Sequence, residues 1–270
     1  MIKLRQFKML KKLLRLLKSQ CFRHKYMLQT CLHGKRNVTA GKTPKCLYVS
    51  PVGRNGKELL IKIMQKFGNE NFDYLIFSYD DTKFDEPIFR NCQVIHEKGL
   101  RWEFMKKYVT PAYCEKYDYI FAWADDIDIE GFSIDKFLDI FIRNSLEMAQ
   151  PALSKDSFYS HRLTLKKEGY RIGRFTDFVE IMVPVFERKA WIKFWKKIKS
   201  DSSGWGWGYD LFARSMCGFK RMGIIDSEPV LHTRPLRETD PGTKAEFENF
   251  LKINDSIHTR SLMLSYGKLK

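Results

Sequence analysis

The stretch YDYIFAWADDID, residues Tyr117 to Asp128, joins an apolar and aromatic run to three carboxylates. The run has the composition of a buried strand. Crowding the like charges of Asp125, Asp126 and Asp128 at a strand end costs free energy unless a cation lies beside them. Their oxygens suit a hard divalent cation such as Mg²⁺ or Mn²⁺, which in turn binds a diphosphate. A solvated turn, in which Asp126 or Asp128 caps the next helix, is the alternative.

Strand-like and helix-like segments alternate on both sides of this stretch. A buried strand is expected in CLYVSPVG (46–53), further strands in FDYLIFSYDD (72–81) and CQVIHEKG (92–99), and helices near 57–67 and in 101–117. Ser133 is placed to cap a helix whose apolar side chains recur at i, i+3 and i+4. The alternation predicts an α/β three-layer sandwich with a mostly parallel central sheet. Ligands of such sheets bind beyond the carboxyl ends of the strands, where Asp125 and Asp126 fall.

The positive charge is concentrated at one end of the 270-residue chain. Residues 1–57 hold fifteen Lys and Arg residues and no acid, so the remaining 33 basic residues face 32 acidic ones. The net charge of +16 therefore belongs almost wholly to the N-terminal segment, which we call the arm. The six cysteines form no CxxC pair, which predicts reduced thiols in a reducing compartment.

The arm opens with MIKLRQFKMLKKLLRLLKSQ, which has the pattern of an amphipathic helix. Its apolar stripe comprises Phe7, Leu10, Leu13, Leu14 and Leu17. Basic residues interrupt every apolar run, which excludes a membrane span or a signal-peptide core. We expect residues 1–20 to lie on an anionic membrane surface. A helix that packs its stripe on the domain and a disordered arm are the alternatives. Nucleic acid is not an expected partner because the arm has few interleaved aromatic residues.

The segment FVEIMVPVFERKAWIKFWKKI (178–198) predicts a strand followed by a helix. A carboxylate inside such a strand must be paired, hydrogen-bonded or functional, and we assign Glu180 to catalysis. In the following loop SSGWGWGYD (202–210), Trp205 and Trp207 can stack on a sugar acceptor. Asp210 can accept a proton from an attacking hydroxyl as a general base. A loop that covers the core with aromatic plugs is an equal alternative.

The segment MGIIDSEPVLH (222–232) predicts a strand that ends at His232. An accessible imidazole is commonly a metal ligand, so His232 is a candidate ligand of the cation at Asp126 and Asp128. In SFYSHRLTLKK, His161 and Arg162 are candidates for binding an anionic donor or acceptor. An exposed basic loop is the alternative there.

Several blocks, in their order and spacing, resemble an uncharacterised family labelled lysine-ketoglutarate reductase trans-splicing-related. The blocks are YVSPVG, FDYLIFSYDD, YDYIFAWADDIDIEGF, MAQPAL, VEIMVPVFERKAW, WGYD and IIDSEPVLH, between about Leu47 and Arg234. The resemblance implies the GT-A-like, Rossmann-like fold of nucleotide-sugar glycosyltransferases. It also implies a Mn²⁺ or Mg²⁺ ion and a nucleotide-sugar donor, for which we expect a UDP-sugar. The family's acidic motif is Asp-Glu-Asp after a Trp, whereas here Ala124 replaces the first acid.

The resemblance assigns a role to each candidate residue. Asp126 is the principal metal ligand, with Asp128 and His232 completing the shell. Nucleotide-binding residues are Asp125, Trp123, Pro51, Gly53 and Asp80; acceptor-binding residues are Trp205 and Trp207; catalytic residues are Asp210 and Glu180.

We therefore expect a metal-dependent glycosyltransferase whose acceptor is a glycan, a polysaccharide or a lipid-linked sugar. The alternatives are a non-catalytic protein of the same fold that binds glycan or a partner, and a nucleic-acid-binding protein acting through the arm. The expected organisation is an arm (1–43), a catalytic domain (44–237) and a partly helical tail (238–270). The expected location is cytoplasmic, at the periphery of a membrane, in preference to a Golgi lumen.

Overall fold

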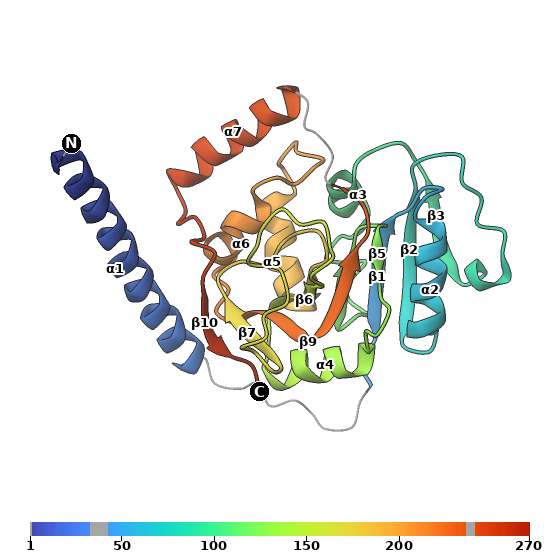
Figure 1. Cartoon of the computed structure of the whole chain (residues 1–270). Helices are drawn as coiled ribbons and strands as arrows, with labels where there is room; N and C mark the ends of the chain where they lie inside the picture. Colours follow the sequence, from blue (N-terminus) through green and yellow to red (C-terminus); the bar gives the residue numbers. More distant parts are fainter. Residues whose placement is uncertain (1, 33–42, 236–240) are drawn as a thin grey trace.

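A computed structural model of the chain describes residues 2–32, 43–235 and 241–270, without the side chains of residues 2–13 and 15. The boundary expected at residue 237 lies outside the described residues. Figure 1 shows a central sheet between helices, with a long N-terminal helix projecting from one side.

The strands are β1 (Cys46–Pro51), β2 (Phe72–Ser78), β3 (Cys92–His96), β4 (Tyr119–Ala122), β5 (Ile127–Asp128), β6 (Met148–Leu153), β7 (Gly173–Thr176), β8 (Val185–Glu187), β9 (Met222–His232) and β10 (Ser265–Lys268). The helices are α1 (Ile2–Leu32), α2 (Lys57–Phe67), α3 (Arg101–Tyr108), α4 (Ile134–Arg143), α5 (Arg188–Ile198), α6 (Tyr209–Cys217) and α7 (Pro241–Asp255), with a short 3₁₀ turn η1 (Pro87–Phe89).

The sheet confirms the predicted α/β architecture. Its strand order is β10-β7-β9-β6-β8-β4-β1-β2-β3, and β5 pairs with β9 beside this path. Strands β3, β2, β1 and β4 are mutually parallel, and β6 is parallel to β9. Along the described path, β7 and β8 run against the other strands. The carboxyl ends of β1, β2 and β4 therefore meet at one edge.

Helices cover both faces of the sheet, which gives the three predicted layers (Figure 1). On one face, apolar side chains of α2 and α4 pack with the sheet into a core that includes Phe67 and Phe137. On the other face, α3, α5 and α6 form a second core that includes Trp102 and Trp191. Ser133 caps α4 as predicted, because its hydroxyl accepts a hydrogen bond of 3.4 Å from the amide of Lys136.

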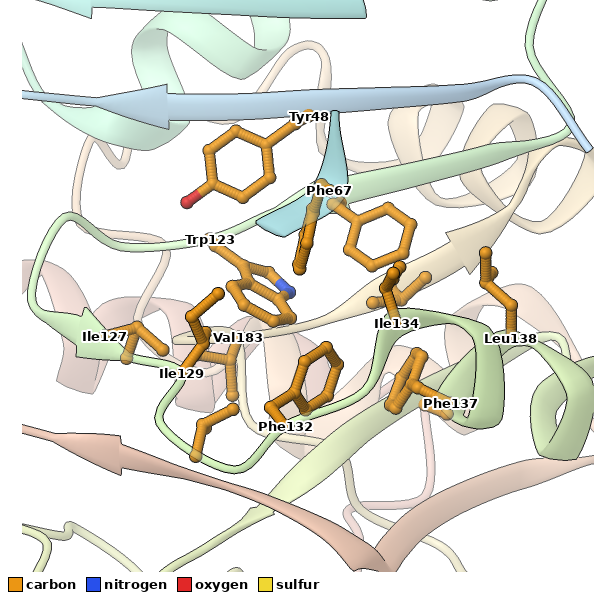
Figure 2. Close-up of a cluster of buried hydrophobic side chains, with 14 of the residues drawn as sticks. Tyr48, Phe67, Trp123, Ile127, Ile129, Phe132, Ile134, Phe137, Leu138 and Val183 are labelled. Atoms are coloured by element: carbon orange, nitrogen blue, oxygen red, sulfur yellow. The ribbon is translucent and has the colours of Figure 1, made fainter. Parts of the chain in front are cut away.

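Trp123 belongs to the first of these cores. Its side chain is fully buried, with ring centroids 5.9 Å from Tyr48 and 5.8 Å from Phe132. Figure 2 shows the indole enclosed by aromatic and aliphatic side chains. The assignment of Trp123 to nucleotide binding is therefore wrong. The strand that carries the acids alternates its side chains, and Trp123 is the last one to point into the apolar layer.

Three local expectations also differ from the structure. The helix expected over 101–117 ends at Tyr108, and turns follow around Pro111. The strand expected from Phe178 is restricted to β8, so Glu180 lies in the loop between β7 and β8. The expected C-terminal tail contributes β10, which pairs antiparallel with β7 and extends the sheet. Short polar strands such as β10 have too few apolar residues to show a period of two.

Among the described residues, no helix is long and apolar enough to cross a membrane.

Candidate functional site

Asp125 lies in the loop that follows β4 and is held from several sides. Its Oδ2 accepts a hydrogen bond of 2.8 Å from the Tyr79 hydroxyl and one of 3.4 Å from the Gly53 amide. Its Oδ1 forms an ion pair with the guanidinium of Arg234. The carboxylate is thus fixed at the edge where β1, β2 and β4 end, as the sequence predicts.

Glycines allow this close approach. A Cβ added at Gly56 would lie 2.5 Å from Oδ2 of Asp125, and one at Gly53 would lie 2.6 Å from Oδ2 of Asp80. Asp80 in turn accepts a hydrogen bond of 3.0 Å from the Arg54 amide. The structure therefore gathers Gly53, Asp80 and Asp125 at one edge.

Pro51 is the last residue of β1 and starts the turn that carries Gly53. It is half-buried beside the carboxyl end of β2, where its Cα partner in the ladder is Phe77.

Asp126 and His232 form the polar centre of this edge. Nε2 of His232 lies 3.1 Å from Oδ2 of Asp126, and the ring's Nδ1 lies 2.7 Å from the carbonyl oxygen of Phe158. Burial opposes ionisation of Asp126, but the hydrogen bond and charge of His232 hold its pKa below the usual value. Burial likewise lowers the pKa of His232, and Asp126 reverses this and raises it. The two groups stabilise each other's charged forms.

This pair fits a divalent cation in two respects. Oδ1 of Asp126 is buried and has no hydrogen-bond partner among the described residues. Because Nδ1 of His232 faces the Phe158 carbonyl, Nε2 is the nitrogen available to a metal, and a bound cation would displace the proton that Nε2 shares with Asp126. Mg²⁺ and Mn²⁺ commonly take one or two protein side chains and complete their shell with substrate phosphates and water.

Asp128 lies apart from this pair. Its carboxylate binds Nζ of Lys62 on α2 at 3.2 Å and accepts a hydrogen bond of 3.0 Å from the Glu130 amide. Within the part of the chain that the structure describes, no group of three or more His, Cys, Asp or Glu side chains is arranged to hold a metal ion. The structure does not bring Asp128 together with Asp126 and His232 as expected, because the Asp128 side chain turns to α2 instead.

Arg234 adds a cation that the sequence did not reveal. Besides its ion pair with Asp125, its Nε lies 3.5 Å from Oδ2 of Asp126. The residue follows β9 by two positions, and the Thr233 amide donates a hydrogen bond of 2.9 Å to the carbonyl of Asp126. Arg234 thus bridges both acids of the loop.

Arg101 connects the acids to a second group of carboxylates. It is the first residue of α3, and its Nη1 donates a hydrogen bond of 3.0 Å to the Met182 carbonyl. Burial lowers the pKa of Arg101 to about 10, against the opposing charges of Asp126, Asp125 and Glu180. A guanidinium surrounded by three acids remains charged at neutral pH and is suited to an anionic ligand.

Glu180 and Asp210 form a buried carboxyl pair. Glu180 is 4% exposed and Asp210 is 8% exposed. Burial raises the pKa of Glu180 to about 7, partly offset by a hydrogen bond from Ser160. Burial and then the charge of Glu180 raise the pKa of Asp210 to about 7. Two carboxyl groups that titrate near neutral pH are suited to proton transfer.

The Gly/Trp loop presents Asp210 at the start of α6. Gly208 adopts a left-handed φ of 91°, which places Asp210 in the first turn of the helix. Trp205 and Trp207 are half-buried, and the Trp207 ring packs edge-on against Phe247 of α7 at 5.6 Å. Trp207 therefore covers the core in part, which was the alternative interpretation, while both indoles keep an exposed portion.

Tyr79, Arg101 and Arg234 were missed because single polar residues outside apolar runs carry no periodic signal. Each follows a strand of the sheet by one to five positions: Tyr79 follows β2, Arg101 follows β3 and Arg234 follows β9. In a parallel sheet, that position places a side chain at the ligand edge, and this was the available clue.

A sequence model of the family described as Protein of unknown function (DUF707) matches residues 15–177 and 171–263. That description names no activity and does not include the reductase label suggested by the sequence blocks. No curated protein matches the chain.

Solved structures that are similar to the chain have very low sequence identity to it. The chain is similar to GalNAc-T7, solved with UDP, GalNAc and Mn²⁺, with 9% identity and a TM-score of 0.53 over 78% of this chain and 48% of GalNAc-T7. It is also similar to the mannosyltransferase PcManGT of Pyrobaculum calidifontis, solved with GDP-Man and Mn²⁺, with 10% identity and a TM-score of 0.46 over 83% of this chain and 66% of PcManGT. A third match is S. aureus TarS 1–349, with 10% identity and a TM-score of 0.44 over 79% of this chain and 73% of TarS. The chain spans about half the length of GalNAc-T7, and the likeness establishes a GT-A-like fold.

Proposed function

The chain belongs to the DUF707 family of proteins of unknown function, and we propose that it is a metal-dependent glycosyltransferase that uses a nucleotide-sugar donor. The observation that carries the proposal is the Asp126–His232 pair at the carboxyl edge of the sheet. The charge of Arg101 interacts electrostatically with Asp126, Asp125 and Glu180. The GT-A-like fold supports the proposal, because ligands of such sheets bind at that edge.

The donor's nucleotide would lie over the turn after β1 and the acids after β2 and β4. The missing Cβ of Gly53 lets Asp80 and Tyr79 pack against the backbone, and Asp80 and Asp125 would supply acceptors for ribose or base. Asp126 and His232 would hold the cation, which when bound neutralises charge on a departing nucleoside diphosphate. Arg101 and Arg234 carry fixed positive charge to the same diphosphate. A UDP-sugar is the donor we expect.

Asp210 would act as the general base in an inverting displacement. The acceptor hydroxyl oxygen forms a bond to the anomeric carbon, and the bond from that carbon to the diphosphate oxygen breaks. The electron pair leaves with the nucleoside diphosphate, and the hydroxyl proton moves to the Asp210 carboxylate. Glu180 tunes this base because its charge raises the pKa of Asp210 toward neutral pH. Trp205 and Trp207 would hold the acceptor, which is a glycan, a polysaccharide or a lipid-linked sugar.

Isothermal titration of UDP, GDP and CDP, with and without Mn²⁺, tests the proposal directly. We expect one nucleotide to bind in a Mn²⁺-dependent manner, and this binding to disappear in Asp126→Asn. If none of the three binds to protein that is shown to be folded, the proposal fails.

A non-catalytic, glycan-binding protein is the second candidate. The ion pairs from Arg234 to both acids favour it, because they neutralise the loop without any metal. Metal-independent glycan binding without nucleotide binding would establish this alternative.

We also propose that the arm attaches the protein to an anionic membrane surface. Leu14, Leu17 and Leu28 of α1 are more than half exposed. The docked side of α1 is different: Tyr26 packs 4.1 Å under the Arg214 guanidinium, and the Thr30 hydroxyl donates to the Lys220 carbonyl at 3.0 Å. Residues two apart in a helix point to nearly opposite sides, so Leu28 faces away from the domain. Leu14, Leu17 and Leu28 are thus free to enter a bilayer surface, and the basic residues of the arm suit anionic lipids.

A further inference from the structure

A cavity of about 810 Å³ with both apolar and basic side chains in its lining opens beside the loop that contains Glu180, outside the donor site described above. The apolar part comprises Leu163, Leu165 and Met263. The rest of the lining comprises Lys155, Ser160, His161, Arg162, Lys166 and Lys167. All but Ser160 can carry positive charge, and no Asp or Glu lines the cavity among the described residues.

Most of this charge is not neutralised. Lys155 is paired with Glu168 at 2.5 Å. In the described part of the chain, the side chains of Arg162, Lys166 and Lys167 form no salt bridge. The charge of Asp226 acts on Lys167, but the Asp226 carboxylate is already paired with Arg174. Unpaired cations converging on one concave surface attract an anion and raise its local concentration.

The wall of the cavity is physically connected to the proposed catalytic groups. Ser160 is a hydrogen-bond partner of the Glu180 carboxyl. The His161 ring packs edge-on against Phe178 at 4.9 Å, two residues before Glu180. The carbonyl of Phe158, in the same loop, is the partner of Nδ1 of His232. The wall of the cavity is therefore in contact with segments that carry Glu180 and His232.

The donor does not account for the cavity. Its nucleotide and diphosphate are assigned to the side of Asp126 that carries Gly53, Asp80 and Arg234, whereas the cavity adjoins Glu180 through Ser160. The acceptor must present its hydroxyl to the carboxyl pair from a side that the donor does not occupy. The cavity lies on such a side and is where we place the acceptor.

We propose that this cavity binds a negatively charged group of the acceptor, so that the acceptor is an acidic sugar chain. The charge is a carboxylate, as in a hexuronate, or a phosphate ester. The identification of the ligand as the acceptor rests on the proposed glycosyltransferase function. The proposal that the cavity binds an anion depends only on the basic residues in its lining. Arg162 and Lys166 provide the contacts, because both are exposed at the cavity and have no salt bridge among the described residues.

Titration with matched probes tests the proposal on the full chain. The probes are trigalacturonate, the neutral trisaccharide galactotriose, and galactose 6-phosphate. We expect the acidic probes to bind and the neutral one to bind at least about tenfold more weakly, since each charged hydrogen bond contributes roughly tenfold in affinity. The preferred acidic probe identifies carboxylate or phosphate as the source of the charge.

Two variants locate the binding. Arg162→Gln combined with Lys166→Gln should weaken the acidic probe at least about tenfold, whereas Lys155→Gln should change it less than about threefold because Lys155 is already paired. Equal binding of neutral and acidic trisaccharide, or an unchanged affinity in the double variant, would overturn the proposal. All three substitutions are at accessible lysine or arginine side chains, and thermal unfolding confirms that the variants remain folded.

UDP titration in the same samples separates the two hypotheses. If the acidic probe binds and no nucleotide does, the anion site stands and the glycosyltransferase proposal fails. If UDP binds with Mn²⁺ and no acidic probe binds, the glycosyltransferase proposal stands and the cavity proposal fails.

Discussion

Nε2 of His232 lies 3.1 Å from Oδ2 of Asp126, and this contact ties the end of β9 to the loop after β4. The antiparallel pairing of β5 with β9 sets the distance, because Ile127 is the ladder partner of His232. The Thr233 hydroxyl adds a hydrogen bond of 3.0 Å to the carbonyl of Asp126. The pairing of β5 with β9 therefore fixes the backbone of the acidic loop. Conservative substitutions of the loop's side chains should change ligand binding without changing the backbone conformation.

Asp126→Asn should abolish Mn²⁺-dependent nucleotide binding, while Asp128→Asn should leave it nearly unchanged. We expect a loss of roughly a hundredfold or more for Asp126→Asn, at or above the upper end of the effect of outer-shell groups at metal sites. Asp128 is the matched control because it is a carboxylate of the same loop that binds Lys62 instead. Titration of UDP with Mn²⁺ measures both variants, and equal losses in the two would contradict the assignment of Asp126.

Gly56→Ala should reduce nucleotide binding through sterics alone. The backbone at Gly56 has a φ of −100°, which alanine adopts without strain, but the new Cβ would lie 2.5 Å from Oδ2 of Asp125. The carboxylate must shift, and a shift approaching 1 Å in a reacting site costs roughly tenfold or more. Gly169→Ala is the control, since a Cβ there meets no atom within 4 Å. An unaffected Gly56→Ala would show that Asp125 is not used in binding.

The activity of the enzyme should rise with pH through about 7. Asp210 must be deprotonated to accept a proton, and its pKa is raised to about 7 by burial and then by Glu180. In Glu180→Gln the neighbouring charge is absent, so the pKa of Asp210 falls and the rising limb moves to lower pH, by roughly one unit. A pH profile of kcat/KM for both proteins measures the shift. If the rising limb of the kcat/KM profile lies at the same pH in both proteins, Asp210 is not the group whose deprotonation controls activity.

The stability of the fold should depend on pH through the same pair, with the opposite sense. The folded-state pKa of Glu180 is raised from 4.5 to about 7, so the protonated form is favoured on folding. Its contribution to the free energy of unfolding is fully present below about pH 4.5 and is lost as pH rises through about 7. Glu180→Gln removes the Glu180 share of this dependence while Asp210 keeps its own, so the variant should lose less stability than the native protein between pH 5 and pH 8, by about 3 kcal/mol. Denaturant unfolding at pH 5 and pH 8 provides the comparison, and a parallel loss of stability in both proteins would refute it.

The central sheet could be predicted from the sequence because its main strands are long enough to be recognised as apolar runs. β1 and β2 are almost fully buried and apolar, and each ends in a turn or an acid that marks the ligand edge. The position of Asp125 and Asp126 followed from that rule alone. The role of Trp123 did not, since motif resemblance places an aromatic residue next to the acids without showing which face of the strand it occupies.

The site itself depends on contacts between distant segments, which periodicity does not reveal. Arg101, Tyr79 and Arg234 reach Asp125 and its neighbours from three separate elements. Asp128 was assigned by its nearness in sequence to Asp126, yet its ion pair is with Lys62 of α2. Such partner choices are set by the tertiary fold, so they become visible only once the sheet and its helices are placed.

Leu17→Ser in α1 should weaken binding to anionic vesicles, while Leu16→Ser should not. Both leucines are 54% exposed, so the two variants remove equal apolar surface from water. Leu17 lies on the stripe with Leu14 and Leu28, whereas Leu16 is two residues from Leu14 and points to the other side of the helix. Burial of a leucine at a bilayer surface contributes about 1 kcal/mol or more, so we expect a loss of roughly fivefold for Leu17→Ser. Sedimentation with phosphatidylserine vesicles measures the loss of binding. The difference between binding to these vesicles and binding to neutral phosphatidylcholine vesicles gives the electrostatic contribution. Equal effects of the two substitutions, or equal binding to both kinds of vesicle, would show that the arm does not lie on an anionic membrane by its apolar stripe.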